Sequence, residues 1–435
     1  MAVYTPEHSA RVMRWYAPAR LGLFYHWGQY TGGGCSAPPD WGAPWHQPFV
    51  HPTVEAFEAA AADPDGIARN MVDLAVYVGA RYIIYTVMHP DDHYLPMYPS
   101  AVDGFVVTVT KDYLGAFLRE CARQGVRAIL YIPGSPQYWH CQDGDWLKAG
   151  YRDAGYRVLL RGVVAELAER YGTLISGFWF DIHDRESGAS ELARRLLPDA
   201  IITVNCDTAF ATPEVDYGTS EVTTGPLDPP YSRPSGLRTV NPWGAMPPKK
   251  DFNEDIPTCN QWWHGSPFIS EEQMLAGPYV QDPTFLVKEM VTSLGQRGQW
   301  NYALGIGPTI DGTPPAIFRP MLENLHRFMA WAGTAIYRTT GGEGAPLEQG
   351  WTGGDGFFSI TASLDDPTVL YLHVTTAPSV DHLVVQHYGR PVKAVTDVRT
   401  GAEHPFHYAG YLVIDSLEWG DVAEYGAKVL RVELA

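Results

Sequence analysis

Short apolar runs alternate with longer amphipathic runs over about the first 340 residues of the chain. Eight of the short runs have the length of buried strands and are rich in β-branched and aromatic residues. These predicted strands are Gly22–His26, Tyr82–Val87, Ala128–Ile132, Gly177–Asp181, Ile201–Asn205, Val215–Tyr217, Ile256–Asn260 and Trp300–Gly305. The alternation is typical of βα units around a parallel sheet, and eight strands are the number that a closed barrel needs.

The amphipathic runs between these strands have apolar residues at i, i+3 and i+4, which predicts helices that pack one face against the sheet. Several of them are followed by glycine, a common residue after the last turn of a helix. The clearest helices are Tyr113–Gln124, Gly155–Tyr171, Glu191–Leu197, Phe285–Gly295 and Ala316–Trp331. Residues 218–255 are rich in Pro, Gly and polar residues, and we interpret them as a long functional loop at the rim of the site.

The pattern changes beyond Tyr337, where short strand-like runs follow one another with no predicted helix. These runs are Gly356–Ala362, Thr368–Thr375, His382–Val385, Ala394–Asp397, Tyr411–Ile414 and Lys428–Val432. The predicted fold class is therefore α/β, a (β/α)₈ TIM-like barrel in residues 1–340 followed by an all-β sandwich in residues 341–435. We expect the sandwich to cover and stabilise one side of the barrel, with carbohydrate binding as the alternative role.

Composition and charge narrow the classes of partner. The 435 residues carry a net charge of −18, so we expect neither nucleic acid nor an anionic membrane as a partner. The five cysteines are scattered without a CxxC pair, which predicts free thiols and no structural zinc. The chain begins without a basic stretch followed by an apolar one, which predicts a cytoplasmic protein; a signal peptide already removed would leave the same sequence.

Polar residues stand at or just past the ends of several predicted strands. They are His26, His89, Asp181, Asn205 and Glu221. In a barrel, the carboxyl ends of the strands meet at one mouth, which is where barrel enzymes carry their active sites. We therefore expect these side chains to converge.

Asp181 ends the apolar run GFWFD, and a carboxylate in such a place is costly to desolvate unless it is hydrogen-bonded or functional. The alternative is that Asp181 caps the next helix, and Asp184 competes with it for the functional role. Glycoside hydrolysis needs two carboxyl groups, one that attacks or activates water and one that protonates the leaving oxygen. Glu221 in DYGTSEVTTG is the leading second carboxyl group. Its rivals are Glu186, Glu254 and Glu271.

The run MHPDDHY places His89 and His93 around two aspartates, a combination that also occurs among metal ligands. The proline within the run and the absence of a helical i, i+4 histidine pair weigh against a metal site. We therefore predict that no metal and no cofactor is needed and that these histidines bind sugar hydroxyls.

At these residues the chain resembles the α-L-fucosidases of glycoside hydrolase family 29. RLGLFYHWGQY, from Arg20, resembles the opening strand of the family, and NYALGIGPTIDGTPP, from Asn301, resembles its closing strand and turn. GFWFD matches the strand that carries the nucleophile, GARYIIYTVMHPDDHY the second strand and AGTAIYRTTGG the exit from the barrel. The resemblance extends over essentially the whole chain.

The resemblance implies a retaining exo-glycosidase that removes terminal α-L-fucosyl or fucose-like residues. Asp181 falls on the nucleophile, Glu221 on the acid/base in some members, His26 and His89 on sugar-binding histidines, and Trp179 on an aromatic residue that lines the site. Further expected substrate-binding residues are Trp41, His93, Tyr131, Asn205 and Trp263.

Three departures from the family pattern point to a divergent specificity. The family commonly shows KHHDGF where this chain has Pro90 in place of one histidine, for which His93 or Asp92 could compensate. A WExC string is reduced to Cys259 with Trp262 and Trp263 after it, and the usual EWY of the first loop is absent, with Trp41 or Trp45 as substitutes.

Three hypotheses remain in competition. The first is an α-L-fucosidase, the second a glycosidase for a different α-linked sugar or a glycosylated metabolite, and the third a non-catalytic carbohydrate-binding barrel. The presence of both Asp181 and Glu221 speaks against the third. Each hypothesis makes a carbohydrate or glycoconjugate the partner, and each leaves open whether copies of the chain associate into a homo-oligomer.

Overall fold

The computed structural model describes most of the two predicted regions. The described residues are 6–29, 53–90, 94–135, 154–181, 184–205, 214–222, 258–264, 282–295, 299–314, 316–341, 350–351, 356–385 and 391–435. For some strand residues, among them 205, 218–222 and 258–264, the backbone alone is described.

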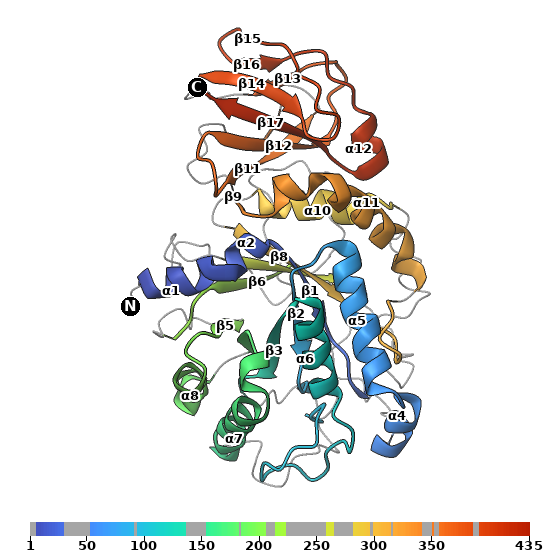
Figure 1. Cartoon of the computed structure of the whole chain (residues 1–435), viewed down its shortest axis with the longest axis vertical. Helices are drawn as coiled ribbons and strands as arrows, with labels where there is room; N and C mark the ends of the chain where they lie inside the picture. The colour runs from blue at the N-terminus through green and yellow to red at the C-terminus, as the bar shows by residue number, and fades with distance from the viewer. Residues whose placement is uncertain are drawn as a thin grey trace.

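Eight parallel strands form one curled sheet in the order β5-β4-β3-β2-β1-β8-β7-β6 (Figure 1). They are β1 Leu21–Tyr25, β2 Tyr82–Thr86, β3 Arg127–Pro133, β4 Gly177–Asp181, β5 Ile201–Asn205, β6 Gly218–Val222, β7 Thr258–His264 and β8 Gln299–Ile306. The two edge strands approach each other, because Thr203 and Tyr217 form an isolated parallel bridge and Asp216 N donates to Ile202 O at 2.8 Å.

The predicted strands agree with this sheet except around β6 and at the end of β7. Two of them, β4 and β5, have the predicted bounds; β2 differs by one residue at its end, and β1, β3 and β8 differ by one residue at each end. The sixth was expected at Val215–Tyr217 with a loop after it, and that expectation is wrong: the strand is Gly218–Val222, so Glu221 lies within a strand. The seventh was expected to end at Asn260, but β7 spans Thr258–His264; residues 256–257 lie outside the described part of the chain.

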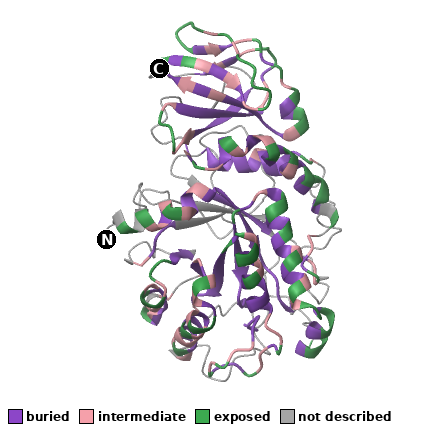
Figure 2. Ribbon diagram, in the orientation of Figure 1, coloured by how far each residue is buried: buried purple, intermediate pink, exposed green. Residues whose placement is uncertain are grey.

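The described residues of β1 to β5 and of β8 are buried on both faces of the sheet almost throughout (Figure 2). Alternate residues point to opposite faces of a strand, so each strand contributes to two apolar clusters. The outer cluster packs under the helices, and the inner one fills the concave side of the sheet. The inner strand residues are Phe24, Tyr82, Ile84, Ile129, Tyr131, Trp179, Ile201 and Ala303, with Tyr217 beside β6.

Three short N-terminal helices close the end of the sheet at which the strands begin. They are α1 Pro6–Arg11, the π-helix η1 Val12–Tyr16 and α2 Ala17–Ala19. Val12, Tyr16 and Ala17 belong to the inner cluster, where the ring of Tyr16 lies 4.3 Å from that of Tyr217 between centroids. Asn301 Nδ2 donates to Tyr16 O at 2.8 Å, and this hydrogen bond attaches the N-terminal helices to β8. The sequence pattern predicted no such helices.

The remaining helices of this region pack on the outer face of the sheet. They are α4 Val54–Ala60, α5 Pro64–Val78, α6 Tyr113–Gln124, α7 Ala154–Tyr171, α8 Ala189–Leu196, α10 Phe285–Leu294 and α11 Arg319–Ile336, with the 3₁₀ turns η3 Gly172–Leu174, η4 Arg185–Ser187 and η7 Ala316–Phe318. α6 has its predicted bounds. α4 and α5 are additional to the predicted helices; α5 is capped by Asp63, whose Oδ1 accepts from Gly66 N at 3.0 Å, and ends at Gly79 with φ 81°.

Two antiparallel sheets make up the C-terminal region. The larger has the order β10-β11-β12-β17-β14 with β9 paired to β11, and the smaller has the order β13-β16-β15. The strands are β9 Thr339–Gly341, β10 Gly350–Trp351, β11 Phe357–Ser363, β12 Val369–Thr376, β13 Leu383–Val385, β14 Val392–Asp397, β15 Phe406–Tyr408, β16 Leu412–Ile414 and β17 Lys428–Leu434. One apolar cluster takes residues from both sheets. The expectation of no helix is wrong, because α12 spans Gly420–Tyr425.

Helices α10 and α11 lie between the parallel sheet and the C-terminal sheets (Figure 1). Ser359 of β11 donates to Val291 O of α10 at 2.8 Å. Arg20, fully buried just before β1, donates to Leu294 O at 2.7 Å. Burial lowers the pKa of Arg20 to about 9. No helix in the described part of the chain is long and apolar enough to cross a membrane.

Candidate active site

Asp181 is the last residue of β4, at the end of the sheet opposite to the N-terminal helices. It pairs in register with Pro133 of β3 and Asn205 of β5, so its neighbours are also at strand ends. Its Oδ2 accepts a hydrogen bond of 2.6 Å from the hydroxyl of Tyr131. The carboxylate is partly exposed, whereas Phe180 before it is fully buried. Asp181 is therefore an oriented carboxylate at the mouth of the sheet, as predicted.

Tyr131 brings Asp181 together with His26 and His89. The ring centroid of Tyr131 lies 5.7 Å from that of His26 and 5.5 Å from that of His89, and the two imidazoles are 5.2 Å apart. His26 is 2% exposed and His89 8%. Three of the expected binding residues thus form one cluster, and Tyr131 links this cluster to the predicted nucleophile.

Backbone contacts at the ends of β1 and β2 hold these histidines. Thr86 Oγ1 donates to Tyr25 O at 3.3 Å and accepts from Trp27 N at 3.2 Å, so the residues on both sides of His26 are tied to β2. Tyr94 N donates to His89 O at 3.0 Å and fixes the turn that carries His89. The rings are therefore placed by strand ends and hydrogen-bonded turns.

Trp179 lies two residues before Asp181 and forms the floor of this cluster. It has no exposed surface, and its ring packs 5.4 Å from Phe24 and 6.3 Å from Tyr217 between centroids. This placement favours a supporting role under the site over direct stacking on a sugar. Phe24, which also lies 4.5 Å from His26, was missed from the sequence, although its position two residues before His26 puts it on the same face of the strand.

Backbone hydrogen bonds at the end of β3 hold the main chain next to Asp181 in place. Gly134 N donates to Asp181 O at 2.5 Å, and the hydroxyl of Tyr156 donates to Pro133 O at 2.7 Å. Burial raises the pKa of Tyr156 well above its ordinary value, and electrostatic interactions with Tyr94 and Asp181 add to this shift. Tyr156 therefore stays a neutral donor. It was not among the sequence candidates, because a helical tyrosine resembles any core residue.

Asp184 and Glu186, the carboxylates closest to Asp181 along the chain, are engaged elsewhere. Arg157 Nε lies 2.5 Å from Asp184 Oδ2, and Arg157 Nη1 lies 2.7 Å from Glu186 Oε2. Asp184 Oδ1 also accepts from Glu186 N at 3.0 Å. These ion pairs give both carboxylates a structural role in the turn η4, which favours Asp181 for the chemistry.

Glu221 lies in β6, where its backbone pairs with Gln261 of β7. The backbones of Asn205 and Trp263 lie near the ends of β5 and β7. Their side chains are outside the described part of the structure, and so are residues Trp41, His93, Glu254 and Glu271. The roles predicted for these residues stay predictions.

No three His, Cys, Asp or Glu side chains gather as metal ligands among the described residues. The run from Asp91 to His93 is not among them, so metal independence remains a prediction.

Comparisons with known proteins identify the family. The sequence model of the family named α-L-fucosidase matches residues 3–334. A search of curated proteins finds no match. Solved structures of similar fold include a trapped covalent intermediate of a Bacteroides thetaiotaomicron α-L-fucosidase with 2-fluoro-fucosyl fluoride, at 18% identity and a TM-score of 0.71, over 100% of this chain and 98% of that one.

Two further structures of similar fold come from other bacteria. The α-L-fucosidase isoenzyme 1 of Paenibacillus thiaminolyticus has 20% identity and a TM-score of 0.68, over 99% of this chain and 100% of that one. The Thermotoga maritima α-fucosidase with a mechanism-based inhibitor has 18% identity and a TM-score of 0.67, over 97% and 96%. At these identities the structures show a shared fold, and the family model carries the assignment. The chain therefore belongs to the α-L-fucosidase family of glycoside hydrolases, glycoside hydrolase family 29.

Proposed function

We propose that this protein is a retaining exo-α-L-fucosidase in which Asp181 is the nucleophile and Glu221 the acid/base. The observation that carries the proposal is the carboxylate of Asp181 at the end of β4, bound at 2.6 Å by the hydroxyl of Tyr131, whose ring lies beside His26 and His89. It occurs in a chain of the α-L-fucosidase family. The trapped intermediate of the Bacteroides relative supports a covalent mechanism.

The proposed reaction has two displacement steps. In the first, Asp181 attacks the anomeric carbon while Glu221 gives its proton to the glycosidic oxygen, so the leaving alcohol departs neutral and the sugar becomes an ester of Asp181. In the second, Glu221 takes a proton from water, the water oxygen attacks the anomeric carbon, and the Asp181 carboxylate is released. The anomeric configuration is retained because it is inverted twice.

The position of Glu221 in β6 supports its proposed role. Strand residues alternate between faces, and Glu221 follows the inward-facing Tyr217 by four positions. β6 lies beside β5 at the bridge between Thr203 and Tyr217, and β5 lies beside β4. We therefore propose that all eight strands close into the complete (β/α)₈ barrel of residues 1–340, with both carboxyl groups at its mouth. The two should lie ~5–5.5 Å apart, the spacing of a retaining pair.

A glycosidase for a different α-linked sugar is the second candidate. Pro90 follows His89 where the family commonly has another histidine, so one donor to the sugar hydroxyls is missing. A site built to bind a hydroxyl discriminates strongly against sugars that lack it, and a lost donor relaxes that discrimination.

The test combines a substrate panel with covalent labelling. Nitrophenyl α- and β-glycosides, including the α-L-fucoside, are assayed first, and the enzyme is then incubated with 2-fluoro-fucosyl fluoride and digested for mass spectrometry. We expect turnover of the α-L-fucoside and one labelled peptide, with the label on Asp181; Asp181→Asn is the unlabelled control. Turnover of another α-glycoside alone selects the second candidate. A label on a different residue removes Asp181 from the proposed role.

A further inference from the structure

The two edge strands of the parallel sheet approach each other through residues 202–203 and 216–217, a contact that we call the β5–β6 seam. Within the described ranges, one backbone bridge between Thr203 and Tyr217 forms this seam, whereas every other pair of neighbouring strands in the sheet forms a ladder. Thr203 Oγ1 also donates to Tyr217 O at 2.7 Å, and Asp216 N donates to Ile202 O at 2.8 Å. The β5–β6 seam therefore depends on few backbone contacts.

The side chain of Asp216 adds further bonds across the β5–β6 seam. It has no exposed surface, and its Oδ2 accepts from Ile202 N at the start of β5 at 2.8 Å. Arg11 Nε, at the end of α1, lies 2.8 Å from Oδ1, and Arg194 Nη2 of α8 donates to Oδ2. One buried carboxylate thus connects the chain that enters β6 to a strand, to the N-terminal helices and to an outer helix.

Both arginines that bind Asp216 are largely buried as well. The side chain of Arg11 is 16% exposed and that of Arg194 is 18% exposed. Arg194 also donates to Ala200 O at 2.6 Å and to Glu214 O at 2.9 Å, so it spans both sides of the β5–β6 seam. Removing one partner of a buried ion pair leaves a charge without compensation, which is far more costly than breaking a surface pair.

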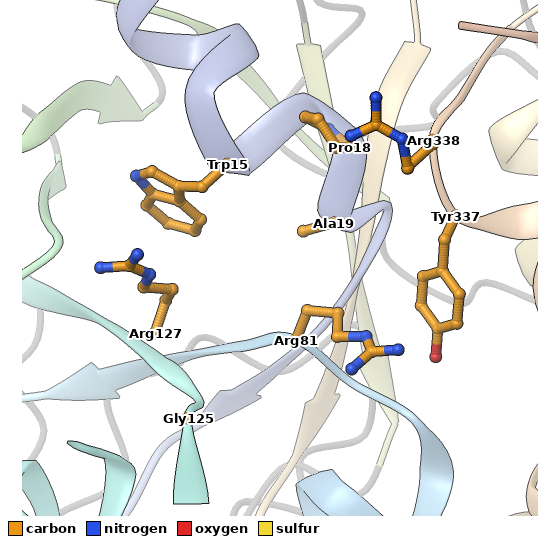
Figure 3. A pocket seen from close by; sticks show the side chains of 8 residues that line it. All are labelled: Trp15, Pro18, Ala19, Arg81, Gly125, Arg127, Tyr337 and Arg338. Atoms are coloured by element: carbon orange, nitrogen blue, oxygen red, sulfur yellow. The ribbon is translucent and has the colours of Figure 1, made fainter. Parts of the chain in front are cut away.

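The N-terminal helices that carry Arg11 are attached to the rest of the protein at several points. Arg338 N donates to Pro18 O at 3.0 Å, in addition to the hydrogen bond from β8 described above. Figure 3 shows Trp15 beside Arg127 at the start of β3, and the guanidinium Cζ lies 5.8 Å from the ring centroid. Arg11 therefore extends from a fixed base.

The β5–β6 seam lies between the strands that carry the two proposed carboxyl groups. The ring of Tyr217 packs 6.3 Å from that of Trp179 between centroids. Trp179 precedes Asp181 by two residues on β4. Along the chain from the seam, Glu221 follows Asp216 by five residues and belongs to β6. A displacement of β6 at the seam would therefore move Glu221 relative to Asp181.

We propose that Asp216 is a positioning residue for the acid/base, and that its ion pairs close the β5–β6 seam and set the distance from Glu221 to Asp181. The inference rests on the proposed function, because it concerns the two carboxyl groups assigned there. A misplacement of ~1 Å can cost ~10²-fold in rate. A loosened seam should therefore impair proton donation by Glu221 and leave the attack by Asp181 largely intact.

Arg11→Gln is the test variant, because it breaks one ion pair and keeps Asp216 paired with Arg194. The matched control is Arg14→Gln, which removes an exposed arginine of the same N-terminal helices that pairs with Asp199. Aryl α-L-fucosides with good and poor leaving groups are assayed. We expect Arg11→Gln to lower kcat/KM by roughly tenfold or more for poor leaving groups and by less than about twofold for good ones, since only poor leaving groups need the acid. The control should behave like the wild type with both.

Hydrogen exchange in the peptide that contains residues 218–222, measured by mass spectrometry, reports on the β5–β6 seam without a substrate. Exchange should be faster in Arg11→Gln than in the wild type and unchanged in Arg14→Gln. Asp216→Asn, which weakens both ion pairs at a similar side-chain size, should show both effects more strongly.

Wild-type exchange in Arg11→Gln and Asp216→Asn would overturn the proposal, and so would kcat/KM values that are unchanged or that fall equally for good and poor leaving groups. A wild-type protein that hydrolyses no α-L-fucoside would instead refute the proposed function. In that case the exchange measurement alone decides whether Asp216 fixes β6.

Discussion

At the scale of single residues, the contacts of three carboxylates that lie close together in sequence support the role that we propose for Asp181. Asp184 and Glu186 lie close by in sequence, but their charges are paired with Arg157. Asp181 accepts a hydrogen bond from the hydroxyl of Tyr131. A neutral donor orients a carboxylate without forming an ion pair with it, which suits the nucleophile role that we propose for Asp181. This distinction depends on contacts between segments far apart in the chain and could not be read from spacing.

Asp181→Gly should abolish turnover while the protein stays folded, because the covalent route is lost and a partly exposed side chain leaves no sealed cavity. We expect kcat to fall by roughly 10³-fold or more. Steady-state kinetics and far-UV circular dichroism provide the two readouts. Wild-type turnover in a folded Asp181→Gly protein would refute the assignment of the nucleophile.

Tyr131→Phe removes the hydroxyl that orients Asp181 and keeps the ring that packs against His26 and His89. Loss of one hydrogen bond to a charged group costs about 1.5–3 kcal/mol, so we expect kcat/KM to fall by roughly 10- to 150-fold. The melting temperature should change little. Phe24→Leu, which alters the floor and leaves the hydrogen bond intact, is the comparison: an equal loss in both variants would mean that packing, not the hydroxyl, is responsible.

Glu221→Ala should slow aryl glycosides with poor leaving groups far more than activated ones, because only the former need a proton from the acid. Azide should restore the rate of activated substrates, since it attacks the glycosyl-enzyme without a base. Both effects are measured by assaying a series of aryl α-glycosides whose leaving groups differ in pKa, with and without azide. If Glu221→Ala behaves like the wild type and Glu254→Ala or Glu271→Ala shows this pattern, the role belongs to that residue.

At the scale of secondary structure, apolar runs bounded by Gly, Pro and polar residues were enough to find the strands of the parallel sheet. β4 and β5 were predicted to the residue, because buried parallel strands read as continuous apolar runs. β6 was misplaced because GTSEV is polar, so its place in the sheet depends on pairing with β7 and not on its own pattern. The N-terminal helices were missed for a similar reason, since their burial comes from closing the sheet.

In the candidate site, too, some features could be predicted from local sequence patterns and others depend on tertiary contacts. Its carboxylate and histidines could be predicted because strand ends of parallel strands converge. The hydrogen bond of Tyr131, the buried placement of Trp179 and the pairing of Asp184 with Arg157 could not, because each depends on side-chain packing between different elements.

Two glycines follow the last turns of helices, and alanine substitutions at them would destabilise the fold for different reasons. At one position only the backbone conformation disfavours alanine, and at the other the added Cβ would also clash. Gly79 after α5 and Gly125 after α6 have φ of 81° and 74°. A Cβ at Gly79 would lie 2.6 Å from the hydroxyl of Tyr337, whereas a Cβ at Gly125 would have no neighbour within 4 Å. We expect Gly125→Ala to cost about 1 kcal/mol of unfolding free energy and Gly79→Ala to cost more, measured by urea denaturation. If both variants lose the same unfolding free energy, the hydroxyl of Tyr337 moves away from the added Cβ without a measurable loss of stability.

At the scale of the whole molecule, α10 and α11 connect the two regions, and a buried histidine stands at their junction. His373 of β12 is fully buried, with Nε2 2.9 Å from Thr361 Oγ1. Burial, with a further contribution from Arg20, lowers the pKa of His373 to about 3. The ring is therefore neutral in the folded protein at neutral pH. Its protonation favours the unfolded chain, whose histidines have ordinary pKa values.

This junction should lose stability in acid. Below pH ~6.5 the unfolded state binds a proton that folded His373 does not, so the free energy of unfolding should fall as the pH decreases toward the folded pKa of about 3. His373→Gln removes the titrating group, and its melting temperature should fall less between pH 7 and pH 5 than that of the wild type. Calorimetry at several pH values measures the difference. Parallel curves for the two proteins would exclude His373 as a source of acid sensitivity.

The pairing of β1 with β8 brings together the first and last strands of the parallel sheet, with Leu21 opposite Tyr302. A ribosome delivers β1 long before β8, so the nascent chain carries an apolar strand, LGLFY, with one edge unprotected for most of its synthesis. The two halves of the sheet cannot join before β8 has been synthesised, and the pairing of β1 with β8 closes a long loop, which is a slow kind of folding step. Expression in a heterologous host should therefore depend on chaperones that shield that edge, and slowing elongation after β1 should lower the yield of soluble enzyme.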